Sequence, residues 1–297
     1  MASYTNLNIP RLADAALQAY VKELAPLMRF STSFSPEAIG GRARGNAVLV
    51  PLVGALVATT FGGTYAVCGG TKTVITVTID RHKVVHVGQR DLDALNNSDS
   101  SLESFGFQQG AALAQAVIED ILTLVTTANF TSVTAVAAAA LDVPQLRAAR
   151  LALNVANAPK SPRAGLIESV GYDGLLAVTN FVQAQMFKDP NVLQEGAVGR
   201  AIGFDLFEVN GSFVSANSVN AFMAHASAIA VAMRYLEPQN PSAYDNAMAV
   251  SDPATGATFG LRDTYDPLTG QRYIAIEANY GYSAGITNGG RIIKRTD

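Results

Sequence analysis

The segment GALVATTFGGTYAVCGG, residues 54–70, has no helical face and carries no Asp, Glu, Lys or Arg. Apolar residues alternate along 48–52 before it and along 75–79 after it, and alternation with a period of two indicates strands. Because a two-stranded ribbon is only marginally stable by itself in water, this segment needs another surface to lie on. The sequence therefore predicts an extended ribbon over residues 46–90, and a neighbouring copy of the chain is the natural surface for it.

A long helix follows the ribbon, in DSSLESFGFQQGAALAQAVIEDILTLV at residues 99–125. Ser100 and Glu103 form an S-x-x-E capping box, which places the start of the helix at Ser100. The helix can run to about Thr127, roughly 40 Å at 1.5 Å per residue. Two apolar stripes run along it, one of Leu102, Phe105, Leu113, Val117, Ile121 and Leu124, the other of Phe107, Ala111, Ala114, Ile118 and Leu122. A helix that is apolar on two sides is packed on two sides.

The composition points away from an ordinary soluble surface. Charged residues make up 15% of the 297 residues, compared with about 25% in typical soluble domains, whereas hydrophobic residues make up 49%. A low share of charged residues indicates a protein whose surface is largely covered by partners. The alternative explanation of this composition is an ordinary enzyme rich in small residues. The net charge is −3 and no Lys/Arg block is present, which argues against tight binding of free nucleic acid.

Several classes of protein are disfavoured by single features. Cys68 is the only cysteine, so an intrachain disulfide and a Cys-based zinc cluster are excluded. Arg11 and Asp14 lie near the N-terminus with no apolar signal core beside them. Glu119 and Asp120 interrupt the most apolar helix, so we expect no membrane span.

The rest of the chain mixes helix and strand patterns. Pro10 opens a helix over 9–29 that Pro26 ends or kinks, and an extended linker follows at 30–45. Two turns of the form Asp-Pro-x-Thr-Gly occur at 252–256 and 266–270. The other predicted elements are a polar turn or bulge at 80–83, a strand at 84–87, a helix at 143–156, a strand at 166–170, a helix at 172–186, a turn and strand at 196–209, strand rather than helix at 219–235, and paired strands at 258–264 and 273–278.

A hydrolase motif is present at residues 281–285, where Gly-Tyr-Ser-Ala-Gly matches G-x-S-x-G. That motif needs a strand-to-helix turn with an acid and a histidine following it in the chain. All three histidines lie upstream and only Asp297 follows as an acid, so a glycine-rich terminal strand explains the segment better.

Candidate metal and phosphate sites have simpler explanations. His82 and His86 lie in a strand context, where four residues span roughly 13 Å, so they are surface or interface histidines rather than ligands of one ion. His225 lies in an apolar segment and fits a satisfied core or interface residue. Asp91 and Asp93, with Asp99, fit a solvated loop better than a cation site. The glycine pairs at 62–63 and 69–70 lack the register of a phosphate-binding loop.

The ordered set of elements resembles the major capsid protein of tailed bacteriophages, whose shell fold is shared with encapsulins. The likeness extends from about Ala13 to Ile293 and depends on the order of elements rather than on one motif. The stretches that are individually similar to this family are DSSLESFGFQQGAALAQAVIEDILTLV (99–125), PRAGLIESVGYDGLLAV (162–178), EGAVGRAIGFDLFEVN (195–210) and AFMAHASAIAVAMR (221–234).

The resemblance implies an α+β phage-capsid shell fold with a mixed α/β axial domain. It divides the chain into an N-terminal arm (1–45), the extended ribbon (46–90), a peripheral domain with the long spine helix (91–141), the axial domain (142–235), long peripheral strands (236–283) and a C-terminal strand that returns to the axial domain (284–297). It implies self-assembly into pentamers and hexamers of an icosahedral shell around double-stranded DNA, with an encapsulin-type nanocompartment as the alternative and a soluble α/β hydrolase as a remote one.

The resemblance implies no catalytic residue, cofactor or metal. It implies a separate scaffolding protein, portal and decoration proteins as partners, weak nonspecific contact with packaged DNA, no membrane, and a location in the virion after assembly in the host bacterial cytoplasm. Lys72 as an isopeptide donor is a minor alternative. Five arginines are scattered charges by default, and in a shell they would pair with acidic residues across subunits or face packaged DNA: Arg42, Arg44, Arg147, Arg150 and Arg163. The candidates for contact between subunits are Leu56, Phe61, Tyr65, Lys72, Arg42 and Arg44.

Overall fold

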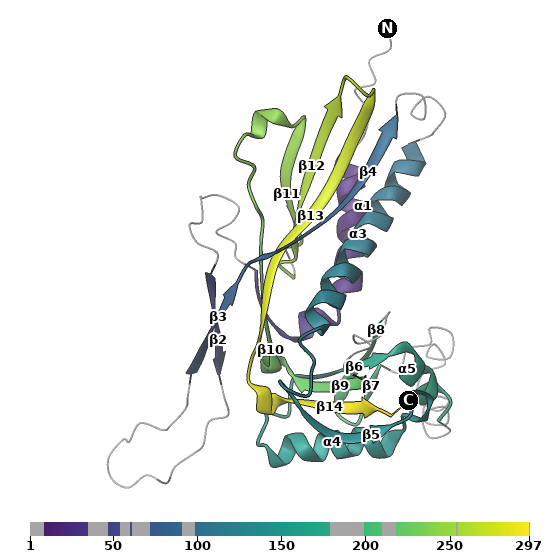
Figure 1. Ribbon diagram of the computed structural model, residues 1–297, viewed down its shortest axis with the longest axis vertical. Coiled ribbons are helices and arrows are strands. Elements are labelled where there is room, and N and C mark those ends of the chain that lie inside the picture. The colour runs from purple at the N-terminus through teal and green to yellow at the C-terminus, as the bar shows by residue number, and fades with distance from the viewer. Residues whose placement is uncertain are drawn as a thin grey trace.

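Two six-stranded sheets and a two-stranded ribbon contain the paired strands of the computed structural model (Figure 1). The structure describes residues 9–34, 47–53, 60, 72–90, 99–178, 199–209, 218–253 and 255–296. Helices and strands are interleaved without a regular repeat, so the α+β class that the sequence predicts is confirmed.

The first sheet forms the long part of the molecule and is built around β13, Gln271–Ala284. Its strand order is β1-β10-β13-β12-β11, and β4 also pairs with β13. The other strands are β1 Ser31–Phe34, β4 Arg81–Arg90, β10 Ile229–Arg234, β11 Asn246–Ser251 and β12 Thr258–Asp266. Along β12 and β13 the buried apolar residues alternate with polar ones, which gives the sheet one core face.

Helices α1, Ile9–Leu24, and α3, Asp99–Leu122, cover that core face (Figure 1). They approach closely because α3 has glycines in the contact. A Cβ on Gly110 would lie 2.2 Å from the carbonyl oxygen of Ala16. On its sheet side, α3 inserts the buried Gln109, whose Nε2 donates to the Ile274 carbonyl at 3.1 Å. The helix is thus packed on two sides, as its two stripes predict.

The two stripes of α3 are confirmed in its second half only. Leu113, Val117 and Ile121 are fully buried. Phe105 and Phe107, however, are 46% and 43% exposed, so their predicted places in the packed stripes are wrong for the subunit. The physical reason is that α1 packs on the glycine side of this turn, where large side chains would not fit. The side chains of the predicted capping box lie outside the described residues.

The second sheet lies at the lower end of the molecule and has the order β5-β14-β9-β6-β8-β7. One face packs through Leu166, Phe222 and Ile292 onto the main core, and the other packs through Ile167 and Met223 onto two helices. Its elements are β5 Thr131–Val136, β6 Arg163–Glu168, β7 Arg200–Ala201, β8 Phe204–Val209, β9 Val219–His225 and β14 Gly290–Arg295, covered by α4 Val143–Val155 and α5 Ser169–Leu176.

Two neighbouring chain segments connect the sheets. One runs from β9 to β10 through a short 3-10 helix, Ala226–Ala228, and the other runs from β13 to β14 through Thr287–Gly289. The Gly285 amide donates to the Ala228 carbonyl at 2.8 Å. His225 lies at this junction, buried, with its Nδ1 2.8 Å from the Ser227 hydroxyl oxygen. It is a satisfied core histidine, which is one of the two places, core or interface, that the sequence predicts for it.

Several element boundaries differ from the sequence expectation. The first helix ends at Leu24 and a 3-10 turn, Leu27–Arg29, follows Pro26. Part of the expected linker forms β1, which pairs in parallel with β10. The polar turn or bulge predicted at 80–83 is wrong, because β4 already begins at Arg81 and its backbone pairs with β13 without a register shift. The strand prediction for 219–235 is confirmed as β9 and β10. The predicted helix end at 179–186 and the loop at 91–98 lie outside the described residues.

Candidate assembly surface

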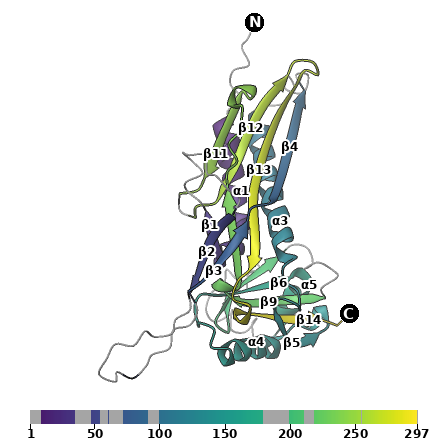
Figure 2. The same ribbon diagram turned by 60° about the vertical axis from the view of Figure 1, so that its left-hand side comes forward.

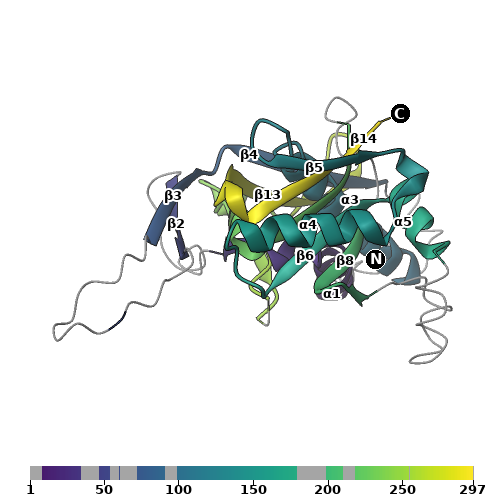
Figure 3. The ribbon, with the colours of Figure 1, turned by 90° about the horizontal axis from the view of Figure 1, so that it is seen from below.

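The base of the ribbon is an isolated antiparallel pair, β2 Ala47–Val53 and β3 Lys72–Thr78. It stands beside the body rather than inside it, as Figures 1 and 2 show from two directions. In the view from below it lies at the opposite edge from α5 (Figure 3). The pairing register joins Val50 to Ile75 and Val48 to Val77, so alternate residues of both strands share one face.

The inner face of the ribbon base packs on β10. Val50, Leu52 and Val77 are buried against the small residues Ala230 and Ala232. These alanines leave room for the larger ribbon side chains, and burying such side chains stabilises by about 1.5–3 kcal/mol each. The ribbon base is therefore anchored on its own subunit by an apolar contact.

A second contact brings the ribbon backbone against β13. A Cβ on Gly281 would lie 2.0 Å from the carbonyl oxygen of Thr78, the last residue of β3. Glycine at this position lets the backbones of β3 and β13 come into contact. The glycine-rich end of β13 therefore has a packing role. This finding agrees with the prediction that 281–285 is a strand and not a nucleophile turn, since β13 continues through Ala284.

The outer face of the ribbon base is apolar and uncovered. Leu49 is 64% exposed, Val74 is 48% exposed, and Pro51 beside Val74 is exposed as well. Thr76 and Thr78 continue this face, which carries no charged side chain among residues 47–52 and 74–78. Exposed apolar surface of this kind is typical of a contact with another macromolecule.

A polar cluster joins the exit of the ribbon to α3 and β13. Arg81 Nη1 lies 3.6 Å from Asp120 Oδ1, and the Arg81 guanidinium lies 5.4 Å from the centre of the Tyr282 ring. The Tyr280 hydroxyl donates to Asp120 Oδ2 at 2.8 Å. Burial first, and then this hydrogen bond, raise the pKa of the Tyr280 hydroxyl. The Tyr282 hydroxyl is 3.1 Å from Thr123 Oγ1.

The sequence does not predict this cluster. Arg81 and Asp120 are far apart in the chain, and the pattern around Asp120 indicates only that it interrupts an apolar helix. The one available signal is the Tyr-x-Tyr spacing at 280 and 282, which places both rings on the same face of a strand. That spacing by itself does not identify a partner.

Of the six predicted candidates for contact between subunits, the structure describes only the backbone of Lys72. Lys72 begins β3, with its backbone opposite Val53, and its side chain lies outside the described part of the chain. The other five, Leu56, Phe61, Tyr65, Arg42 and Arg44, lie outside the described residues entirely. The candidate surface within the described residues is therefore the ribbon base.

The charged residues on the body divide into exposed and internal ones. Arg147 and Arg150 are exposed on α4. Arg163 is buried and donates to the carbonyls of Pro159 and Ala158, both at 2.7 Å. Burial first and then Arg150 lower the pKa of Arg163. An internal guanidinium satisfied by two carbonyls serves the subunit's own fold.

The two strand histidines do not share a site. His82 Nε2 contacts the Glu277 carboxylate at 3.0 Å, and Arg262 lies 2.6 Å from the other oxygen of that carboxylate. His86 is exposed farther along β4. Among the residues that the structure describes, no group of three His, Cys, Asp or Glu side chains gathers as metal ligands. No helix in the described ranges is both long and apolar enough to cross a membrane.

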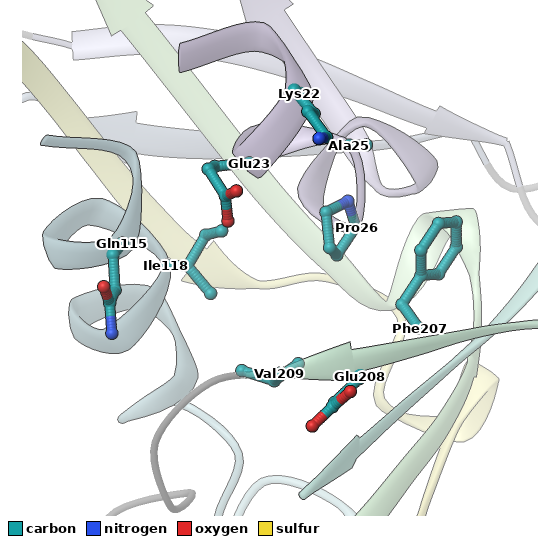
Figure 4. Close-up of a pocket in the computed structure, with 9 residues that line it drawn as sticks. All are labelled: Lys22, Glu23, Ala25, Pro26, Gln115, Ile118, Phe207, Glu208 and Val209. Carbon is teal, nitrogen blue, oxygen red and sulfur yellow. The ribbon is translucent and has the colours of Figure 1, made fainter. Parts of the chain in front are cut away.

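One cavity of about 210 Å³ lies where α1, α3 and β8 meet (Figure 4). Its apolar wall comes from Ile118, Phe207 and Val209, with Pro26 closing one side. Lys22, Glu23 and Glu208 also line it without a nucleophile beside them. This combination offers a small groove with charged and apolar walls and no constellation for acyl or phosphoryl transfer.

Comparison with solved structures identifies the architecture. The chain is similar to the capsid of the cyanophage P-SCSP1u at 14% identity, with a TM-score of 0.53, 85% of this chain and 84% of that chain covered. It is similar to the mature capsid of bacteriophage PhiM1 at 11% identity, with a TM-score of 0.52, 91% and 87% covered. This chain has the phage-capsid shell fold.

The same shell fold extends to a virus-like particle from Pyrococcus furiosus, at 13% identity and a TM-score of 0.51, with 96% of this chain and 98% of that chain covered. No family model matches the sequence, and no curated protein matches it either. The shell fold is thus recognised from the arrangement of helices and strands. At sequence identities of 11–14%, the likeness to these structures shows a shared fold and nothing more.

Proposed function

We propose that this chain is a major capsid protein that assembles into the icosahedral shell around the double-stranded DNA of a tailed bacteriophage or prophage. The observation that supports it most strongly is the ribbon base, which is anchored on its own subunit by one face and presents a bare apolar face on the other. In a chain with the phage-capsid shell fold, such a face is suited to a neighbouring copy.

The proposed mechanism is mechanical. The ribbon (46–90) of one subunit lies over its neighbour, the N-terminal arm (1–45) reaches along another, and α3 stays rigid within the peripheral parts (91–141 and 236–283). The axial domain (142–235), joined by the C-terminal strand (284–297), gathers around the axes of pentamers and hexamers. Repeated head-to-tail contacts whose rotations close produce rings and then a shell. No residue is assigned a chemical step.

The contents of the shell distinguish the leading function from its alternative. Phage-type shells hold DNA, and the exposed Arg147 and Arg150 on α4 are candidates for weak, salt-sensitive contact with it. Scaffolding, portal and decoration proteins are the further partners that we propose, with assembly in the host bacterial cytoplasm and a final location in the virion. An encapsulin-type compartment, favoured by the likeness to the Pyrococcus furiosus particle, would hold protein cargo instead.

Purified protein tests the assembly directly. Light scattering and negative-stain microscopy should show closed particles, or rings of five or six subunits, with or without a scaffolding partner. Stable monomers under both conditions would refute the proposal. Nuclease-protected DNA inside the particles supports the phage reading, and a co-purifying protein with no DNA supports the compartment.

Replacing residues 54–71 with a short Gly-Ser turn tests the ribbon. The strand pairing of β2 and β3 and the inner apolar contact remain, so the circular dichroism and melting of the unassembled subunit should match wild type. Particles should be lost. A variant that unfolds would place the segment in the subunit's own core, and intact particles would show that the ribbon tip has no assembly role.

A further inference from the structure

The junction between the ribbon and the body is very short. Only Ile79 and Asp80 separate the end of β3 at Thr78 from the start of β4 at Arg81. Gly281 of β13 touches the Thr78 carbonyl and Ile79 packs against the apolar anchor of the ribbon. The direction in which the ribbon leaves the body is therefore decided by the contacts of a few residues.

Arg81 is the first residue on the body side of this junction, and its side-chain contacts outside the junction lead to α3 and β13. Its guanidinium is held between the Asp120 carboxylate at 3.6 Å and the ring of Tyr282 at 5.4 Å. Oδ1 of Asp80, an exposed residue, lies 3.6 Å from Nε of Arg81. The ion pair with Asp120 is the only one of these contacts that joins the junction to the long helix.

Asp120 is positioned to hold Arg81 in one place. Its side chain is only 15% exposed, and the Tyr280 hydroxyl fixes its other oxygen at 2.8 Å. The Tyr282 hydroxyl in turn lies 3.1 Å from Oγ1 of Thr123, the residue that follows the end of α3. Both partners of Arg81 are therefore oriented by a further hydrogen bond, which reduces the entropy lost when the contact forms.

We propose that Arg81, Asp120 and Tyr282 form a positioning clamp that sets the angle between the ribbon and α3, and through it the angle between neighbouring subunits. The second part of this inference rests on the proposed assembly function. The first part concerns the subunit alone and can be tested without particles.

Small rotations at the clamp are amplified along the ribbon. Each ribbon strand has seven described residues, about 23 Å of strand. A rotation of about 10° at the base would move the far end of those strands by about 4 Å. A shift of this size is enough to remove side-chain contacts with a neighbour, because apolar contacts extend over about 4 Å.

Asp120→Asn is the central variant, and Glu119→Gln is its matched control. Asn keeps an acceptor for the Tyr280 hydroxyl but loses the charge that attracts Arg81. Glu119, the preceding residue on α3, is exposed and contacts Gln115 rather than the junction. Both variants lose one carboxylate charge from the same helix turn.

Hydrogen exchange of the unassembled full chain measures the clamp independently of assembly. In Asp120→Asn the amides of 72–81 should exchange about fivefold faster than in wild type, the factor that a partly exposed ion pair can supply. Glu119→Gln should match wild type. Equal exchange in all three proteins would overturn the clamp whether or not the chain forms shells.

Arg81→Gln removes the other partner and guards against a folding defect of the first variant. It should reproduce the exchange of Asp120→Asn, and the double variant should add nothing more. Additive effects would show that the two residues act separately and would overturn the clamp.

Particle diameter then tests the assembly part. Asp120→Asn should give particles of shifted or broadened diameter, while Glu119→Gln should give wild-type particles. Unchanged diameters with faster exchange would limit the clamp to the subunit and refute its role in the angle between subunits. Absence of particles from wild type as well would refute the proposed function instead.

Discussion

Helix α3 and the ribbon base are separated by a single strand, β4, along the chain, yet they are stabilised in opposite ways. Helix α3 is covered on two sides by its own chain, through α1 and through the first sheet. The ribbon base is covered on one side by β10 and leaves Leu49 and Val74 exposed on the other. Two sides of α3 are thus buried within the subunit over its second half, whereas only one face of the ribbon base is buried.

This difference separates what the subunit needs to fold from what it needs to associate. Substitutions at the buried positions of α3 should affect the free energy of unfolding of the isolated chain. Substitutions on the outer face of the ribbon base should leave that free energy unchanged and act only when copies meet. Each prediction below measures one side of this comparison.

The largest effect is expected from Val117→Asp, in the fully buried stripe of α3. Burying an unpaired carboxylate among Leu113, Ile121 and their neighbours should cost at least about 4 kcal/mol. Expression should give insoluble protein or a chain without a cooperative thermal transition. A folded and assembling variant would contradict the placement of α3 in the core.

Gly110→Val should be the next most damaging change. Its Cβ would fall 2.2 Å from the Ala16 carbonyl oxygen, which forces α1 and α3 apart and should cost about 3 kcal/mol. Ala112→Val, at an exposed position of the same helix, is the control for the β-branched side chain. Urea titration of both proteins checks the contact, and equal midpoints would show that the helices do not approach so closely.

A matched pair of valines on β3 compares the two faces of the ribbon base. Val77→Ala, on the inner face, should lower the free energy of unfolding by about 2 kcal/mol. Val74→Ala, on the outer face, should change it by less than about 0.5 kcal/mol. Val74→Asp should keep the melting temperature of the subunit and reduce particle yield. Similar losses of stability at both positions would remove the distinction between the faces.

The smallest effect is expected at the junction between the sheets and depends on pH. Burial first, and then the nearby Arg163, lower the pKa of His225 from its ordinary value of 6.5, although a hydrogen bond with the Ser161 backbone opposes this. Below pH 6.5 the unfolded chain therefore binds more protons than the folded chain, and stability falls as the pH falls.

Denaturant titrations of wild type and His225→Gln between pH 7.5 and 5 would measure this loss. The variant should lose less stability over the interval, while the ribbon, which lies away from His225, should keep its exchange rates. An identical pH dependence of the two proteins would show that His225 does not titrate differently in the folded state.

Local patterns predicted much of the fold. The alternation along 48–52 and 75–79 predicted β2 and β3, and the 3.6-residue spacing from Leu113 to Ile121 predicted the buried half of α3. The Asp-Pro-x-Thr-Gly turns form as expected, with Gly256 and Gly270 at positive φ. The predictions of these features are correct because each feature depends only on residues that are close together in the chain.

The amino-acid sequence by itself determined the periodicities, the turns and the uncharged character of the ribbon. Tertiary structure alone decided that Phe105 and Phe107 stay exposed, that β4 begins at Arg81, and that Arg81 meets Asp120 and Tyr282. The physical reason is distance along the chain. A hydrophobic period depends on residues three or four positions apart, whereas an ion pair or a glycine contact depends on which distant segments the closed core brings together.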